Sequence, residues 1–97
     1  MKELIKKGLG CLDYIRKADQ QDRWGGPFNG QQFRQRIFAD LLHHFPIKAI
    51  IETGTYRGTT TALFAETALP VYSVESHPRF YGFAKMRFRN HRDTIHL

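Results

Sequence analysis

The segment at residues 52–58, E-T-G-T-Y-R-G, combines a carboxylate, hydroxyl groups and two glycines between an apolar run and a helix-like stretch. Gly54 lets the backbone turn sharply and keeps a side chain out of a ligand's way, and Gly58 does the same where the next helix begins. The free N–H groups and positive dipole end of that helix favour a carboxylate or a phosphate. The threonines at 59–61 can cap the helix or bond the ligand. We therefore predict a ligand-binding turn that starts at Glu52.

A second carboxylate, Glu75, ends the next apolar run and lies 21 residues after Gly54. Ligands of open parallel sheets bind beyond the carboxyl ends of the strands, and an acid at about this separation accepts the hydroxyls of a ribose. The glycine turn and the second acid together indicate a cofactor that carries a nucleoside.

Two such cofactors are a nicotinamide dinucleotide and S-adenosylmethionine. The dinucleotide fingerprint is G-x-G-x-x-G, in which the middle glycine lets the pyrophosphate approach. Here Tyr56 blocks that approach, and the spacing of the glycines differs. Glu52 would also repel a diphosphate, whereas it suits the ammonium group of a methionine moiety. These residues favour S-adenosylmethionine, and an NAD(P)-dependent oxidoreductase stays as the alternative.

The elements that must position these residues follow from apolar periodicity and from glycine and proline breaks. Asn29 is the expected cap of the second helix. From residue 47 onward strands and helices alternate, which predicts a parallel sheet with right-handed crossovers. The first strand is nearly continuous in apolar residues, as is typical of a strand buried on both faces. We expect helices over residues 2–19, 31–45, 59–68 and 77–90, and strands over residues 47–53, 71–75 and 94–97.

The predicted fold class is α/β: a partial Rossmann-like parallel sheet of about three strands with helices, preceded by two amino-terminal helices. In the first helix, Gly8 and Gly10 each cost roughly 1 kcal/mol. The glycine-rich residues 24–31 then suit either a lid over a cofactor or a connecting loop. We favour the loop, with Trp24 and Phe28 packed on the core.

Residues 52–58 resemble the first motif of class I S-adenosylmethionine-dependent methyltransferases, acid-x-G-x-x-x-G, with Tyr56 in place of the usual middle glycine. Residues 71–76 resemble the second strand of that family, which ends in a ribose-binding acid, here Glu75. The resemblance covers about residues 47–97.

This resemblance implies that Glu52, Gly54, Thr55 and Gly58 surround the methionine end of S-adenosylmethionine and that Glu75 binds its ribose. It also implies transfer of a methyl group from the cofactor to an acceptor. In the family the catalytic residues follow later strands, so no catalytic residue and no acceptor is predicted.

Two segments are expected along the chain. Residues 1–46 form a helical amino-terminal segment and loop, which resembles the variable segment that precedes the family's core. Residues 47–97 form the first half of the cofactor-binding domain, because the family's core contains more strands. We accordingly expect the amino-terminal part of a larger enzyme, inactive by itself. The strand at 47–53 would then expose an apolar edge, which favours self-association.

The 97 residues carry a net charge of +6, which allows contact with nucleic acids without demonstrating it. Residues 79–92 interleave five Lys and Arg with aromatic residues, a pattern also found in nucleic-acid binders. A non-enzymatic nucleic-acid-binding module is therefore the second alternative. However, Phe80, Phe83 and Phe88 share one helical face, which predicts that they lie in the core.

The remaining features of the composition bear on location and metals. The single cysteine, Cys11, allows no internal disulfide, which indicates a reduced, cytoplasmic setting. No stretch has the apolar length of a secretory signal or a membrane span, so no membrane partner is expected. The five histidines lack the spacing of zinc ligands, and no metal site is expected.

Overall fold

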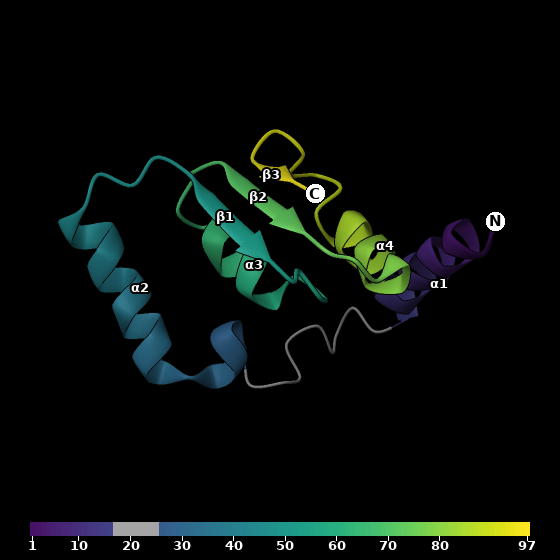
Figure 1. Ribbon diagram of the computed structural model, residues 1–97, viewed down its shortest axis with the longest axis horizontal. Coiled ribbons are helices and arrows are strands. Elements are labelled where there is room, and N and C mark those ends of the chain that lie inside the picture. Colours follow the sequence, from purple (N-terminus) through teal and green to yellow (C-terminus); the bar gives the residue numbers. More distant parts are fainter. Residues whose placement is uncertain (17–25) are drawn as a thin grey trace.

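The computed structural model describes residues 1–16 and 26–97, and these ranges form an α/β arrangement (Figure 1). The predicted fold class, with a three-stranded parallel sheet and two amino-terminal helices, is confirmed and is compatible with a partial Rossmann-like fold. The elements in chain order are α1 (Lys2–Arg16), the 3-10 turn η2 (Pro27–Gly30), α2 (Gln32–His44), β1 (Ile50–Thr53), α3 (Thr59–Ala65), β2 (Val71–Val74), α4 (Pro78–Arg87) and β3 (Ile95–His96).

The sheet has the strand order β1-β2-β3, and both pairs of neighbours are parallel. Ile50 lies opposite Val71, and Val71 lies opposite Ile95. Crossovers between parallel strands are right-handed as a rule, so two crossovers that advance in the same direction across the sheet put α3 and α4 on the same face. The core forms between these layers, where Val71 and Ile95 pack with Phe64 of α3 and with Ala84 and Phe88 at α4.

The opposite face of the sheet is left uncovered by the described residues. Ile51 is 82% exposed, Val74 61% and Tyr72 48%. The expectation that the first strand is buried on both faces is therefore wrong, and the strand is also shorter than expected, Ile50–Thr53. The physical reason is the topology: two crossovers of the same direction put both helices on one side.

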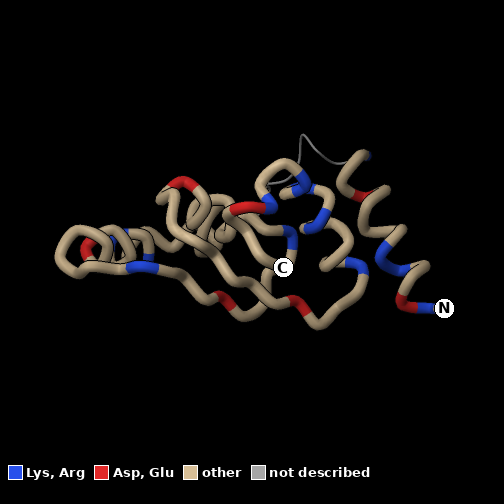
Figure 2. The backbone as a smooth tube through the Cα atoms, turned by 90° about the horizontal axis from the view of Figure 1, so that it is seen from above, with Lys and Arg blue, Asp and Glu red and all other residues tan. Residues whose placement is uncertain are grey.

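Helix α1 lies along α4 at one end of the molecule, next to the N-terminus marked in Figure 2. The two backbones meet at glycines: a Cβ on Gly10 would lie 1.9 Å from the Arg79 carbonyl oxygen, and one on Gly82 would lie 2.0 Å from that of Lys7. Asp13 accepts two hydrogen bonds from the Arg79 guanidinium, at 2.6 and 3.0 Å. Gly10 thus offsets its low helix propensity with a close helix contact. The expected residues 17–19 of this helix lie outside the described residues.

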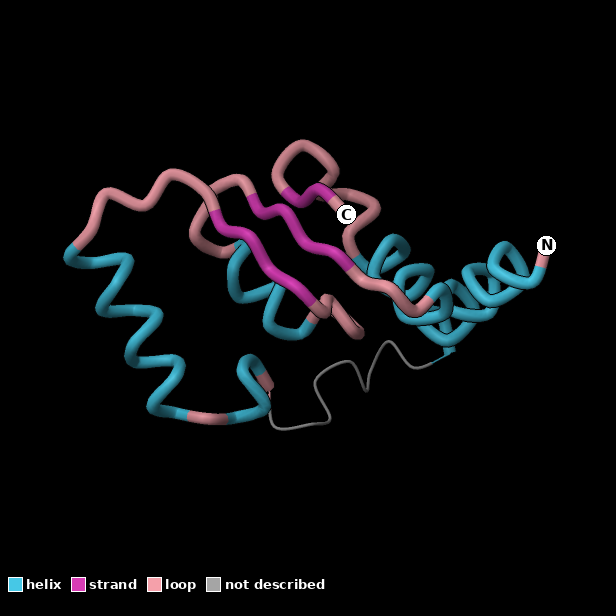
Figure 3. Tube along the Cα trace, in the orientation of Figure 1, coloured by secondary structure: helices cyan, strands magenta, loops and turns pink. Residues whose placement is uncertain are grey.

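Helix α2 stands at the other end, beside the β1 edge (Figure 3). It begins at Gln32, and its cap position is Gln31 with no side-chain hydrogen bond. The expectation that Asn29 caps it is wrong, because Asn29 belongs to η2. The helix contacts the core through Phe38, whose ring lies 5.0 Å from that of Phe64. Among the described helices, none has the length and apolar character needed to cross a membrane.

Candidate functional site

The turn between β1 and α3 passes three times through the left-handed backbone region, with φ of +80° at Gly54, +52° at Tyr56 and +83° at Gly58. A Cβ added to Gly54 would meet no atom within 4 Å, so the outer surface of the turn is bare at this residue. A Cβ added to Gly58 would lie 2.5 Å from Cε2 of Phe88. Gly58 is therefore needed for the packing of α3 against Phe88, and Gly54 is the glycine that leaves room for a ligand.

Tyr56 adopts the backbone conformation that a glycine takes most easily, although the left-handed region costs an ordinary residue about 1–2 kcal/mol. Several contacts hold it there. Its ring packs edge-on against Phe80 with centroids 4.4 Å apart, and the Arg57 guanidinium lies 5.6 Å from the ring centroid. Its backbone N–H donates to Oε1 of Glu75 at 2.7 Å. Although Tyr56 stands where the family motif usually has its middle glycine, the backbone is still left-handed at this residue.

The Glu52 carboxylate is held by a chain of buried hydroxyl groups. Its Oε1 accepts hydrogen bonds from the Thr61 hydroxyl and, at 2.7 Å, from the Ser73 hydroxyl. Ser73 Oγ in turn lies 2.5 Å from Thr55 Oγ1. Because the Ser73 proton is donated to Glu52, Thr55 must donate to Ser73. Desolvation by burial raises the pKa of Glu52 above its usual value, and the hydroxyl donors lower it in part.

A small cavity of about 60 Å³ opens beside Glu52. Such a volume holds a few water molecules or a small polar head group. Its lining residues include an acid and three threonines, whose oxygens accept hydrogen bonds, so it suits a cation or a hydrogen-bond donor. The lining residues are Gly26, Asn29, Glu52, Thr55, Tyr56, Thr59 and Thr60.

Part of this cavity wall comes from residues 24–31 of the amino-terminal segment, for which the sequence favours a connecting loop. Phe28 packs against the core, as that interpretation predicts, and Trp24 lies outside the described residues. However, Gly26 and Asn29 line the cavity. The signal in the sequence was the cluster of glycines with Asn29, which is typical of left-handed backbone but does not reveal what the turn contacts.

Glu75 lies on the other side of the turn. Its Oε1 accepts the Tyr56 N–H, and its Oε2 accepts the His77 N–H at 2.9 Å. An ionised carboxylate has about four lone-pair sites, so each oxygen can still accept a hydroxyl. Glu75 lines a different, larger and more open pocket of about 220 Å³ beside Lys7 and Tyr81.

The structure therefore brings the predicted site residues into one region but not into one cavity. Glu52 and Thr55 lie together at the small cavity. Gly54 leaves the turn bare, and Glu75 is tied to the far side of the turn through Tyr56. Gly58 belongs to the packing rather than to the cavity lining.

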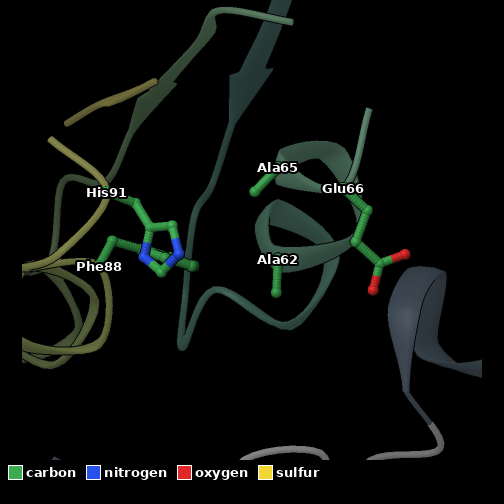
Figure 4. Close-up of a pocket in the computed structure, with 5 residues that line it drawn as sticks. All are labelled: Ala62, Ala65, Glu66, Phe88 and His91. Atoms are coloured by element: carbon green, nitrogen blue, oxygen red, sulfur yellow. The ribbon is translucent and has the colours of Figure 1, made fainter. Parts of the chain in front are cut away.

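Another cavity, of about 240 Å³, lies between α3 and the segment that follows α4. Its floor is apolar, formed by Ala62, Ala65 and Phe88, with His91 and Glu66 at its rim (Figure 4). The Glu66 carboxylate points away from His91, so the two polar groups do not converge on a ligand (Figure 4). This cavity has less to offer a charged ligand than the region of the glycine turn.

Comparisons with protein-family models, with curated proteins and with solved structures find no match. The arrangement of side chains is therefore what supports a function. Within residues 1–16 and 26–97, no group of three or more His, Cys, Asp or Glu side chains is placed to hold a metal ion.

The basic residues give little support to nucleic-acid binding. Lys and Arg occur at both ends of the molecule, along α1 and α2 as well as after α4 (Figure 2). Phe83 and Phe88 are 2% and 5% exposed, so they cannot stack on bases. Arg79 is paired with Asp13, and Arg87 donates to the Arg57 carbonyl oxygen at 3.1 Å. The prediction that three phenylalanines of this segment lie in the core is confirmed for Phe83 and Phe88. It is wrong for Phe80, which is half-buried and packs against Tyr56 and His77.

Proposed function

We propose that this chain is the cofactor-binding part of an S-adenosylmethionine-dependent methyltransferase of the cytoplasm. The observation that carries the proposal is the hydrogen bond between Glu75 and the Tyr56 N–H. It joins an acid at the tip of β2 to a bare glycine turn at the tip of β1, which is where open parallel sheets bind nucleoside cofactors.

The donor and acceptor chemistry of the site suits this cofactor. The Glu52 carboxylate attracts an ammonium group, and the cavity beside it accommodates a small head group. Gly54 presents no side chain to a ligand that crosses the turn. Glu75 has lone pairs left for the two ribose hydroxyls. Glu52 and Gly54 thus match the amino acid end of S-adenosylmethionine, and Glu75, at the tip of β2, matches its ribose.

When bound, the cofactor supplies a methyl group activated by the positive sulfur. The residues of this chain bind and orient the cofactor. They do not identify the acceptor of the methyl group. Alignment of the reacting groups contributes a large part of the rate in such reactions. The chain's own contribution is therefore the rigid turn, which Tyr56, Glu75 and the Glu52 hydroxyl network hold in place.

Two features disfavour the nicotinamide alternative. A diphosphate at the turn would approach the negative charge of Glu52, which lines the cavity. The Tyr56 side chain also occupies the middle position, where the dinucleotide fingerprint requires glycine. We accordingly expect no nicotinamide binding at this turn.

Isothermal titration calorimetry of the 97-residue chain with S-adenosylhomocysteine and with NADH tests the proposal. We expect S-adenosylhomocysteine to bind and NADH not to bind. Loss of a hydrogen bond to a charged group costs about 1.5–3 kcal/mol, so Glu75→Gln should weaken binding by about tenfold or more. Glu66→Gln, an exposed acid at the other end of α3, is the matched control. Binding of NADH with no response to S-adenosylhomocysteine would overturn the proposal.

A further inference from the structure

The turn η2 contains two non-glycine residues in the left-handed region, Phe28 at φ +55° and Asn29 at φ +56°. Such backbone costs an ordinary residue about 1–3 kcal/mol and persists only where surrounding contacts enforce it. Those contacts are present. The Phe28 N–H donates to Thr60 Oγ1 at 2.9 Å, and the Gln35 side chain donates to the Pro27 carbonyl oxygen at 2.9 Å. The turn is therefore fixed to α3 on one side and to α2 on the other.

The Phe28 ring adds to this anchoring. It lies 5.7 Å from the ring of Phe64 and 5.8 Å from that of Phe38. Asn29, the next residue, lines the cavity that also contains Glu52. The packing of Phe28 thus holds the neighbouring Asn29 at the ligand cavity, although the two residues are far from Glu52 in the sequence.

The seven described residues that line this cavity differ in what they offer a ligand. Glu52 is an acceptor with a negative charge, and the threonines and Tyr56 have hydroxyl groups. Asn29 is the one lining residue among them whose side chain carries N–H donors. An α-amino acid has an ammonium and a carboxylate on the same carbon, so it requires an acceptor and a donor close together. Glu52 and Asn29 supply this pair.

We propose that Asn29 is a binding residue for the carboxylate of an α-amino acid ligand whose ammonium group is bound by Glu52. The inference rests on the proposed function, since the methionine end of S-adenosylmethionine is such a group. It adds a specificity residue from the amino-terminal segment, outside the glycine turn. The Asn29 carboxamide N–H donates to the ligand's carboxylate, and the neutral amide adds no repulsion toward it.

Asn29→Gly separates this role from a backbone role. Glycine adopts left-handed φ more easily than asparagine, so the variant keeps the turn and removes only the side chain. Ala68→Gly is the matched control, because Ala68 is exposed, has φ of +62° and does not line the cavity. Thermal unfolding of both variants should show melting temperatures equal to or above that of the wild type.

The binding readout is calorimetry with S-adenosylhomocysteine and with 5′-methylthioadenosine, which lacks the amino acid end. Asn29→Gly should weaken S-adenosylhomocysteine binding by about tenfold and leave 5′-methylthioadenosine unchanged, whereas Ala68→Gly should change neither. Asn29→Asp should weaken S-adenosylhomocysteine binding further, because the negative charge of the aspartate repels the ligand's carboxylate.

The outcomes separate the two proposals. If the wild type binds S-adenosylhomocysteine and Asn29→Gly binds it equally well, Asn29 has only a backbone role and the inference is overturned while the proposed function stands. If the wild type binds neither ligand, the proposed function fails and the inference fails with it. A similar loss for both ligands in Asn29→Gly would also overturn the inference, since 5′-methylthioadenosine has no carboxylate.

Discussion

Glu75 accepts the backbone N–H of Tyr56 at 2.7 Å, so an acid at the end of β2 is attached to the glycine turn that follows β1. The bond connects two adjacent parallel strands at their carboxyl ends, beyond the last residue pair of the ladder, Thr53 and Val74. It orients the Glu75 carboxylate by a main-chain group, which a substitution of the Tyr56 side chain leaves in place. The turn and the acid therefore behave as one unit.

Tyr56 offers the first test of this unit. Tyr56→Gly relieves the left-handed backbone and loses the ring contact with Phe80, so the two effects oppose each other. We expect a change of less than about 1 kcal/mol in the free energy of unfolding in urea, with S-adenosylhomocysteine binding retained. Tyr56→Val, which is β-branched, should destabilise the chain by about 2 kcal/mol or more. Equal losses for the two variants would contradict the claim that backbone conformation governs this residue.

The two glycines of the turn should respond differently to alanine. At Gly58 the new methyl group would overlap Phe88, so Gly58→Ala should destabilise the fold by about 2–4 kcal/mol. At Gly54 the space is open, and only the backbone strain of about 1–2 kcal/mol remains. Gly54→Ala should nevertheless weaken S-adenosylhomocysteine binding, because the methyl group enters the path of the ligand. Urea unfolding and calorimetry check the pair, and wild-type affinity in Gly54→Ala would show that no ligand crosses this residue.

The contact between α1 and α4 predicts a contrast between neighbouring glycines. Gly10→Ala should be destabilising by more than about 2 kcal/mol, because its Cβ would collide with the Arg79 carbonyl. Gly8 is in the same helix, and a Cβ added there would meet nothing within 4 Å, so Gly8→Ala should stabilise by about 0.5–1 kcal/mol. Urea unfolding of both variants tests the contact. Similar stabilisation by both alanines would mean that α1 does not pack on α4 through Gly10.

Glu52 should make stability depend on pH in an unusual direction for an acid. Its pKa is raised in the folded state by desolvation, so the folded chain retains a proton that the unfolded chain has already lost. The contribution of Glu52 to the free energy of unfolding is full at pH values below its usual pKa of 4.5. This contribution is lost as the pH rises through the raised pKa of the folded state. Relative to Glu52→Gln, the wild type should therefore lose stability as pH rises across that window. Urea unfolding at a series of pH values measures the difference, and a gain in relative stability over the same window would contradict the buried environment of Glu52.

The uncovered face of the sheet predicts self-association. Ile51 in the edge strand β1 and Val74 in the neighbouring strand β2 expose apolar side chains, a combination that favours pairing with a second copy. Analytical ultracentrifugation should show sedimentation that increases with concentration, and Ile51→Lys should reduce it. Asn90→Lys, at an exposed residue away from this face, is the control for added charge. A well-folded monomer at all concentrations would count against the prediction.

Local patterns in the sequence were sufficient to predict the main helices and strands and a sharp glycine turn after the first strand. The alternation of strands and helices from residue 47, and the prolines that bound them, predicted a parallel sheet that the structure confirms. Features that depend on contacts between residues far apart in the sequence could not be predicted. The sequence shows that Gly58 lacks a side chain but not that Phe88 fills the space.

The same limit applies to the candidate site. Asn29 was expected as a helix cap, because asparagine suits caps and left-handed turns equally well. Its place at the Glu52 cavity depends on the packing of Phe28 between two other helices. The exposed face of β1 was also missed, since an apolar run indicates burial without specifying which faces the described helices cover.

The central claim is that an adenosyl amino acid binds across the turn between Glu52 and Glu75. The most direct measurement is a two-dimensional ¹H–¹⁵N NMR titration of the chain with S-adenosylhomocysteine. We predict saturable shifts of the Gly54 and Tyr56 amides, with the Ala65 and His91 amides beside the larger cavity unchanged. Saturable shifts confined to that larger cavity, or no shifts at all, would contradict the account.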